Sequence, residues 1–198
     1  HDSKNTSQNG KLYFLGAKLK YKIGGIERET TVVPDYIYVL PTPMLTLDYF
    51  LPETGNGDDP NTQKIEASVT FTLGLRIKNN GHGIATSLSI GSAQPKIIDN
   101  VLGLLIGFTI LQTDINGMQS NSGFKVDFGN LEPLKLGSAR WKLETTLDGR
   151  FKDFTVDLKH ADAVGGKLTS LVDLVNTPTL IHDVVVDIPG RDQVYDFL

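Results

Sequence analysis

The 198-residue chain contains no cysteine, and this absence removes several kinds of chemistry at once. Thiol nucleophiles, thiolate metal sites, disulfide bridges and thiol-based redox switches are all excluded. Apolar residues make up 39% of the chain and charged residues 21%, an ordinary composition for a globular protein. A chain of this size can fold around one core without a disulfide or metal staple.

The sequence also lacks an excess of positive charge and a long apolar run. Its 19 basic and 23 acidic residues give a formal charge of −4, which does not suit a nucleic-acid backbone or an anionic lipid surface. The longest apolar run, residues 101–111, is far shorter than the roughly 20 residues of a membrane-spanning helix. We therefore expect no nucleic-acid partner and no membrane span. The absence of a signal-peptide pattern and of an initiating methionine favours a processed protein or a fragment.

Strict alternation predicts a β-hairpin near the N-terminus. Between residues 17 and 23, apolar side chains alternate with three lysines, which is the pattern of a half-buried strand. Gly24 and Gly25 supply positive-φ residues for a tight turn, and residues 26–33 are predicted to return as the second strand. A further extended run over residues 36–40 leads to a stiff connector, Pro41-Thr42-Pro43.

This connector separates two regions of different charge. Residues 1–43 carry a net charge of +2 and residues 44–198 carry −6. We predict that residues 1–43 form an N-terminal β-hairpin arm, or the remnant of a preceding sandwich domain, and that residues 44–198 form one elaborated β-sandwich. Because two or three strands make a poor domain alone, the arm is expected to dock on the following domain, to complete a neighbouring copy, or to be the surviving end of an upstream sandwich domain.

Strand-like segments separated by turn-forming loops recur along residues 44–198, as in a sandwich or barrel. They are predicted at residues 45–51, 68–78, 85–90, 104–111, 123–128, 139–147, 151–159 and 182–188. The only helix expected is a short one over residues 168–175, where four apolar residues share one face. The predicted fold class is therefore all-β: an antiparallel, immunoglobulin-like β-sandwich.

The single tryptophan indicates which face of one strand points inward. In the segment 139–147, alternation places Trp141 in phase with Ala139, Leu143, Thr145 and Leu147. Trp141 is accordingly predicted to be a core anchor rather than a sugar-stacking platform. The opposite face of the strand is predicted to be solvated; it carries Arg140, Lys142 and Glu144.

Residues 73–90 combine a strand, the corner Asn79-Asn80-Gly81-His82-Gly83, and a second strand of pattern Ala-x-x-Leu-x-Ile. Gly81 and Gly83 permit the backbone to cross between strands where a Cβ would clash, and Ala85 is small enough for the corner to close. This segment resembles the CARDB-type and related immunoglobulin-like repeats of large bacterial cell-surface proteins. The resemblance implies a β-sandwich that acts as a spacer, adhesive or assembly module outside the cell, with no catalytic residues.

An acidic loop after the first sandwich strand is a candidate metal site. Its oxygen-bearing side chains are Glu53, Asn56, Asp58, Asp59 and Asn61. Calcium suits such a set because it takes six to eight oxygen ligands in flexible geometry, although the spacing is not that of an EF-hand. A solvated acidic loop is the alternative interpretation. The sortase-like pentapeptide at residues 51–55 is interpreted as turn chemistry, since more than a hundred residues follow it.

The sequence offers little support for a catalytic site. The four histidines lie far apart in the sequence, and neither a Gly-x-Ser-x-Gly elbow nor a His-Glu-x-x-His pair is present. An enzyme would require His160, Asp162 and His182 to share a cleft. We therefore expect a protein that is not an enzyme.

Two functions of different classes are predicted. The first is a non-enzymatic structural or adhesive module, extracellular or at the cell surface, whose arm adds a strand to another copy or to a neighbouring domain and so builds a filament or array. The second is a calcium-dependent module that binds a glycan or another ligand. In that case the 53–61 loop would hold the metal, and Tyr13, Tyr36 and Tyr38 are the candidate exposed aromatics.

Overall fold

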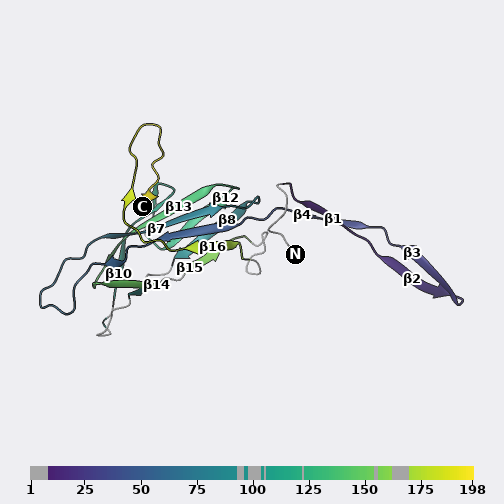
Figure 1. Cartoon of the computed structure of the whole chain (residues 1–198), viewed down its shortest axis with the longest axis horizontal. Coiled ribbons are helices and arrows are strands. Elements are labelled where there is room, and N and C mark those ends of the chain that lie inside the picture. Colours follow the sequence, from purple (N-terminus) through teal and green to yellow (C-terminus); the bar gives the residue numbers. More distant parts are fainter. Residues whose placement is uncertain are drawn as a thin grey trace.

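A computed structural model describes residues 9–92, 96–97, 104, 106–121, 123–153, 156–161 and 170–198. Within these ranges the chain forms strands and loops without a helix, and so no helix that could cross a membrane is found there. A narrow arm, made of two successive two-stranded ribbons, extends from a body of packed sheets (Figure 1). The all-β prediction is confirmed.

Four strands build the arm. Strand β1 (Lys11–Leu15) pairs with β4 (Asp35–Val39), and β2 (Lys18–Ile23) pairs with β3 (Ile26–Thr31), both antiparallel. The Val32 N–H donates to the Ala17 carbonyl at 2.9 Å and joins the two ribbons. Among the described strands, those of the arm pair only with one another.

The larger sheet of the body has six strands in the order β11-β10-β13-β7-β5-β16. Neighbours are antiparallel except β16, which runs parallel to β5. The strands are β5 (Leu45–Phe50), β7 (Phe71–Asn79), β10 (Phe108–Ile115), β11 (Met118–Ser120), β13 (Leu136–Thr145) and β16 (Val172–Asn176).

A three-stranded sheet of order β12-β8-β15 packs against the six-stranded sheet. It consists of β8 (Ala85–Ser92), β12 (Lys125–Leu131) and β15 (Val156–Lys159). Two small sheets complete the body: β6 (Thr54–Gly55), β14 (Gly149–Asp153) and β9 (Lys96–Ile97) form one, and β17 (Asp183–Val184) with β18 (Asp196–Phe197) the other.

The hydrophobic core lies between the six-stranded and three-stranded sheets. Leu75 and Trp141 from the larger sheet meet Leu88 and Ile90 from the smaller one, and all four are fully buried. Inward side chains recur at every second position, as the pleat of a strand requires. The Trp141 indole N–H donates to the Gly123 carbonyl at 2.9 Å, so the polar edge of this ring is satisfied inside the core. The prediction that Trp141 is a core anchor is confirmed.

Several predicted strands have different bounds in the structure. The strand expected from residue 104 begins at Phe108; residues 101–103 and 105 lie outside the described part of the chain. The segment 151–159 is divided between β14 and β15, which belong to different sheets, and 182–188 contributes only β17. Strand ends depend on where a pairing partner stops, which alternation alone does not indicate.

The short helix predicted over residues 168–175 is wrong. Residues 168 and 169 lie outside the described ranges, but residues 172–175 belong to β16, which pairs with β5 in parallel. The Leu45 N–H donates to the Leu171 carbonyl at 2.8 Å at the start of this pairing. The β-branched Val172 and Val175 favour extended backbone, and the edge of β5 offers the hydrogen bonds that a helix would have formed internally.

The two ends of the C-terminal segment, residues 180–184 and 192–198, lie on the outer face of the six-stranded sheet, and the loop between them extends from the body (Figure 1). The Phe197 ring stacks on Phe50 with centroids 5.1 Å apart. A Cβ built on Gly74 would lie 2.6 Å from the Phe197 ring, so the glycine in β7 leaves the space that this ring fills. Side chains on the outer face of the sheet are therefore not all in water.

Arg140 is buried because the C-terminal segment covers it. It was predicted to be solvated, yet it is buried on β13. Its guanidinium binds the Asp114 carboxylate at 3.1 Å and also the Asp183 carboxylate, and it lies 4.1 Å from the centroid of the Tyr195 ring. Alternation correctly places Arg140 on the outer face, but it does not indicate that a later segment covers that face.

Candidate assembly interface

The β2–β3 hairpin at the tip of the arm has the predicted geometry. Gly24 and Gly25 adopt φ values of 59° and 81°, which side chains other than glycine rarely take, and they connect Ile23 directly to Ile26. Residues directly opposite each other in the register share a face of the ribbon. The lysines of β2 therefore share one face of the ribbon with Glu27 and Glu29 of β3, and Ile23 shares the other face with Ile26.

One face of the hairpin is charged, and its lysines form ion pairs with glutamates of the same ribbon. Lys18 and Lys20 both pair with Glu29, at 3.1 Å and 3.4 Å, and Lys22 pairs with Glu27 at 3.0 Å. These pairs are solvent-exposed, so each contributes less than about 1 kcal/mol to stability. Their main effect is to make this face hydrophilic.

The opposite face of the hairpin is apolar and exposed. Leu19 is 54% exposed, and Ile23 and Ile26 face each other near the turn with Ile26 63% exposed. Tyr21 lies on the same face, opposite Arg28. We call the side chains of Leu19, Tyr21, Ile23 and Ile26 the apolar arm face. No described residue of the body covers it, which is unusual for four large apolar side chains on one ribbon.

The base of the arm carries a second exposed cluster, which is aromatic. Phe14 lies opposite Tyr36, and Leu12 opposite Tyr38, so these four side chains share a face of the β1–β4 ribbon. Phe14 is 71% exposed, and the two tyrosines are also exposed. Tyr13 lies on the other face, where the Lys11 ammonium is 5.1 Å from its ring centroid. The three candidate tyrosines therefore do not form one platform.

The arm is joined to the body by a hydrogen-bonded clamp at the Asn-Asn-Gly-His-Gly corner. The Asn80 N–H donates to the Met44 carbonyl at 2.7 Å, and the Gly83 N–H donates to the Thr42 carbonyl at 3.2 Å. The buried Asn79 side chain accepts from the Met44 N–H through Oδ1 at 3.2 Å. The corner after β7 therefore binds residues 42 and 44 and fixes the point where the arm leaves the body.

Two glycines make this close approach possible. A Cβ on Gly81 would lie 2.5 Å from both the Met44 nitrogen and the Thr42 oxygen, and one on Gly83 would overlap the Pro41 carbonyl. The sequence predicted that these glycines permit a crossing of backbones, and the structure identifies the crossing chain as the Pro-Thr-Pro connector. The pairing of this corner with a segment about 40 residues earlier was not predicted.

We expect Asn79→Ala to lower the free energy of unfolding by roughly 2 to 3 kcal/mol, measured by urea titration. Asn79 is fully buried, and its amide group also donates to the Gly83 and Leu131 carbonyls at 2.8 Å and 3.1 Å, so its removal leaves buried backbone groups unpaired. Asn80→Ala is the matched control, with an expected loss below about 1 kcal/mol, since its side chain makes one bond to Thr46. Equal losses in the two variants would contradict this account.

The predicted ligands of the acidic loop make contacts within the protein. Glu53 forms an ion pair with Arg150, and Asp59 Oδ1 accepts hydrogen bonds from the backbone and side chain of Asn61. Asp58 Oδ1 accepts from the Glu66 N–H at 3.0 Å. The backbone carbonyl of Asn56 accepts from the Val69 N–H at 2.9 Å. Across the residues that the structure describes, no group of three or more histidine or acidic side chains is placed to hold a metal ion. Calcium binding stays a prediction, which calorimetry on the parent and on Asp58→Ala would test.

Of the candidate catalytic residues, His160 and His182 lie on different elements of the described chain. Asp162 lies outside the described residues. His160 Nδ1 lies 3.2 Å from the Ala161 carbonyl, beside β15, whereas the backbone of His182 pairs with Leu198 on the C-terminal segment.

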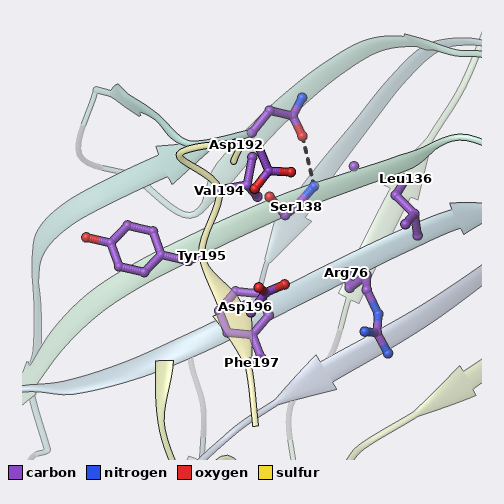
Figure 2. Close-up of a pocket in the computed structure, with 10 residues that line it drawn as sticks. Arg76, Leu136, Ser138, Asp192, Val194, Tyr195, Asp196 and Phe197 are labelled. Carbon is purple, nitrogen blue, oxygen red and sulfur yellow. Dashed lines mark hydrogen bonds between the residues drawn. The ribbon is translucent and has the colours of Figure 1, made fainter. Parts of the chain in front are cut away.

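A groove of about 260 Å³ lies where the C-terminal segment crosses the outer face of β7 and β13 (Figure 2). Figure 2 shows Asp192 and Asp196 on the crossing segment, with Arg76 of β7 to the side of it. Arg76 is already paired with Asp48 at 2.9 Å. The groove therefore combines two acidic side chains with an arginine whose charge Asp48 already neutralises.

Comparison with known proteins does not identify a relative. The chain matches no protein-family model, no curated protein and no solved structure. The likeness of residues 73–90 to CARDB-type repeats therefore stays a prediction from the sequence, and the arm with its clamp is the feature on which a functional proposal can rest.

Proposed function

We propose that this chain is a non-enzymatic structural or adhesive module, with an immunoglobulin-like body, that works outside the cell or at its surface and associates through its N-terminal arm. The partners are copies of the chain or neighbouring domains of a surface protein. The observation that carries this proposal is the apolar arm face, which is held away from the body and which no described residue covers (Figure 1).

The energetic argument starts from the arm itself. An isolated two-stranded ribbon is marginally stable in water, and its outer edges leave backbone N–H and C=O groups without ladder partners. Burying a large apolar side chain contributes about 1.5 to 3 kcal/mol. Contact with another sheet would therefore stabilise both the arm and the assembly, which is the energetic basis of strand addition.

The clamp and the sequence resemblance support two further parts of the proposal. The bonds from Asn80 and Gly83 to the connector restrain the base of the arm, so less orientational freedom is lost when a partner binds. The setting outside the cell and the immunoglobulin-like topology rest on the likeness of residues 73–90 to surface repeats.

Sedimentation velocity over a hundredfold range of concentration tests the proposal with the full chain. The parent is expected to associate, and the double variant Leu19→Thr with Ile23→Thr is expected to need at least tenfold higher concentration for the same association, since tenfold corresponds to only about 1.4 kcal/mol. Threonine keeps the strand propensity of both positions.

Lys20→Thr with Lys22→Thr is the matched control, because it changes the same strand on its charged face. This control is expected to lose far less association than the apolar-face variant, because it leaves the apolar arm face intact. A parent that stays monomeric throughout, or an apolar-face variant that associates like the parent, would overturn the proposal.

A further inference from the structure

We infer that the arm of one copy is received by the free edge of β16 in the next copy, where it extends the six-stranded sheet. This inference rests on the proposed function and specifies the partner surface. Strand β16 occupies one end of the sheet order, so one side of its backbone has no neighbouring strand among those described.

The edge strands of the body differ in how well they are protected against strand addition. Charged side chains and bulges are the usual protection of an edge. Strand β15 carries exposed Asp157 and Lys159, and β12 has two register shifts together with Lys125 and Asp127. Strand β11 has only three residues. These three edges are poor acceptors.

Strand β16 has less of this protection, with one acidic residue, Asp173, and one register shift between Val172 and Leu174. Leu174 and Val175 are each 51% exposed, and the strand contains no lysine or arginine. Val175 pairs with Leu47, whose side chain belongs to the core, so Val175 lies on the core-facing side of the sheet although half of it is in contact with solvent. The sandwich is thus incompletely covered along this edge.

The arm has the complementary pattern. In β2 the apolar residues Leu19, Tyr21 and Ile23 alternate with lysines, so one orientation places the apolar set against Val175 and the lysines on the outer face of the sheet. Asp48 lies on that outer face, where it pairs with Arg76. The net charges agree with this docking, since residues 1–43 carry +2 and residues 44–198 carry −6.

The acceptor is a second copy rather than the same chain. The arm points away from the body, and its strands pair only with each other in the described chain (Figure 1). A contact between the arm of one copy and β16 of another is heterologous, because the two surfaces differ. Repetition of such a contact builds an open chain of subunits unless the rotation closes a ring.

Lysine at the acceptor edge tests the inference in the full chain. We expect Val175→Lys to require at least tenfold higher concentration for association than the parent in sedimentation velocity, because an inward-pointing charge blocks an edge. Met118→Lys is the matched control: Met118 is 72% exposed on β11, at the opposite end of the same sheet, and this variant is expected to associate like the parent.

Disulfide cross-linking provides a second readout that does not depend on the fold of a lysine variant. Because the chain has no cysteine, a Tyr21→Cys chain mixed with a Val175→Cys chain reports their proximity directly. A cross-linked dimer that forms in this mixture, and not when Met118→Cys replaces Val175→Cys, supports the inference.

Equal cross-linking to both edges, or undiminished association of Val175→Lys, would overturn it. If in that case the apolar arm variants still lose association, the proposed function stands and only the acceptor is wrong. A monomeric parent would overturn both.

Discussion

Replacing Trp141 with alanine is expected to lower the free energy of unfolding by about 3 to 5 kcal/mol, which is a large part of the stability of an ordinary domain. Trp141 is fully buried between the two sheets, so the variant leaves a cavity that the surrounding strands can fill only in part. It also leaves the Gly123 carbonyl without its indole donor. Urea unfolding followed by far-ultraviolet circular dichroism measures the loss, since the variant has no tryptophan fluorescence.

Trp141→Phe separates the two contributions. Phenylalanine retains much of the ring volume but has no N–H group, so the expected loss is smaller than in the alanine variant and includes the indole hydrogen bond to the Gly123 carbonyl, which keeps a bond from the Thr113 hydroxyl at 3.2 Å. An alanine variant as stable as the parent would contradict the placement of Trp141 in the core.

Replacing Arg140 with methionine is expected to lower the free energy of unfolding by about 3 to 5 kcal/mol. This loss is large for a residue that alternation places on the outer face of the sheet. The substitution leaves the buried Asp114 carboxylate without its guanidinium partner, and an unpaired charge away from water is strongly destabilising. Asp183 and the Tyr195 ring lose a contact as well, which loosens the C-terminal segment on the sheet. Urea titration of the full chain gives the magnitude.

Two further variants show whether burial is the cause. Arg140→Met combined with Asp114→Leu removes the more deeply buried pair of charges and is expected to recover part of the lost stability, because apolar replacement of a buried pair is often nearly neutral. The rest of the loss remains because the Asp183 carboxylate stays without its guanidinium partner. Lys142→Met, on the same face of β13, is expected to change stability by less than about 0.5 kcal/mol. A loss for Arg140→Met as small as that for Lys142→Met would show that Arg140 is solvated.

Local sequence patterns predicted the elements whose conformation depends on near neighbours. The Gly24-Gly25 hairpin requires only alternation and positive-φ residues in the turn, and both are visible in the sequence. The inward phase of Trp141 follows from the period of a strand. The glycines of the corner were correctly connected with a close backbone approach, because only glycine permits a crossing of that kind.

Two predictions were wrong because they depend on distant segments. The apolar spacing of residues 168–175 fits a helix face, but the edge of β5 supplies backbone partners that make residues 172–175 a strand. The helix period and a short apolar run are hard to separate over two turns, and the tertiary partner decides between them. Arg140 was predicted to be solvated because residues 180–198, which cover it, come 40 residues later.

The candidate interface shows the same division. The sequence by itself determined that this protein is all-β, that residues 17–33 contain a hairpin with one apolar and one lysine face, and that chemistry depending on cysteine is excluded, because these properties follow from composition and from the two-residue period of a strand. Only the tertiary structure decided that the apolar arm face lies uncovered, that Asn79 and two glycines clamp the connector, and that β16 ends the larger sheet without a further neighbour among the described strands. Each of these depends on which distant backbone and side chains come into contact, and contact at long sequence separation is a property of the whole fold.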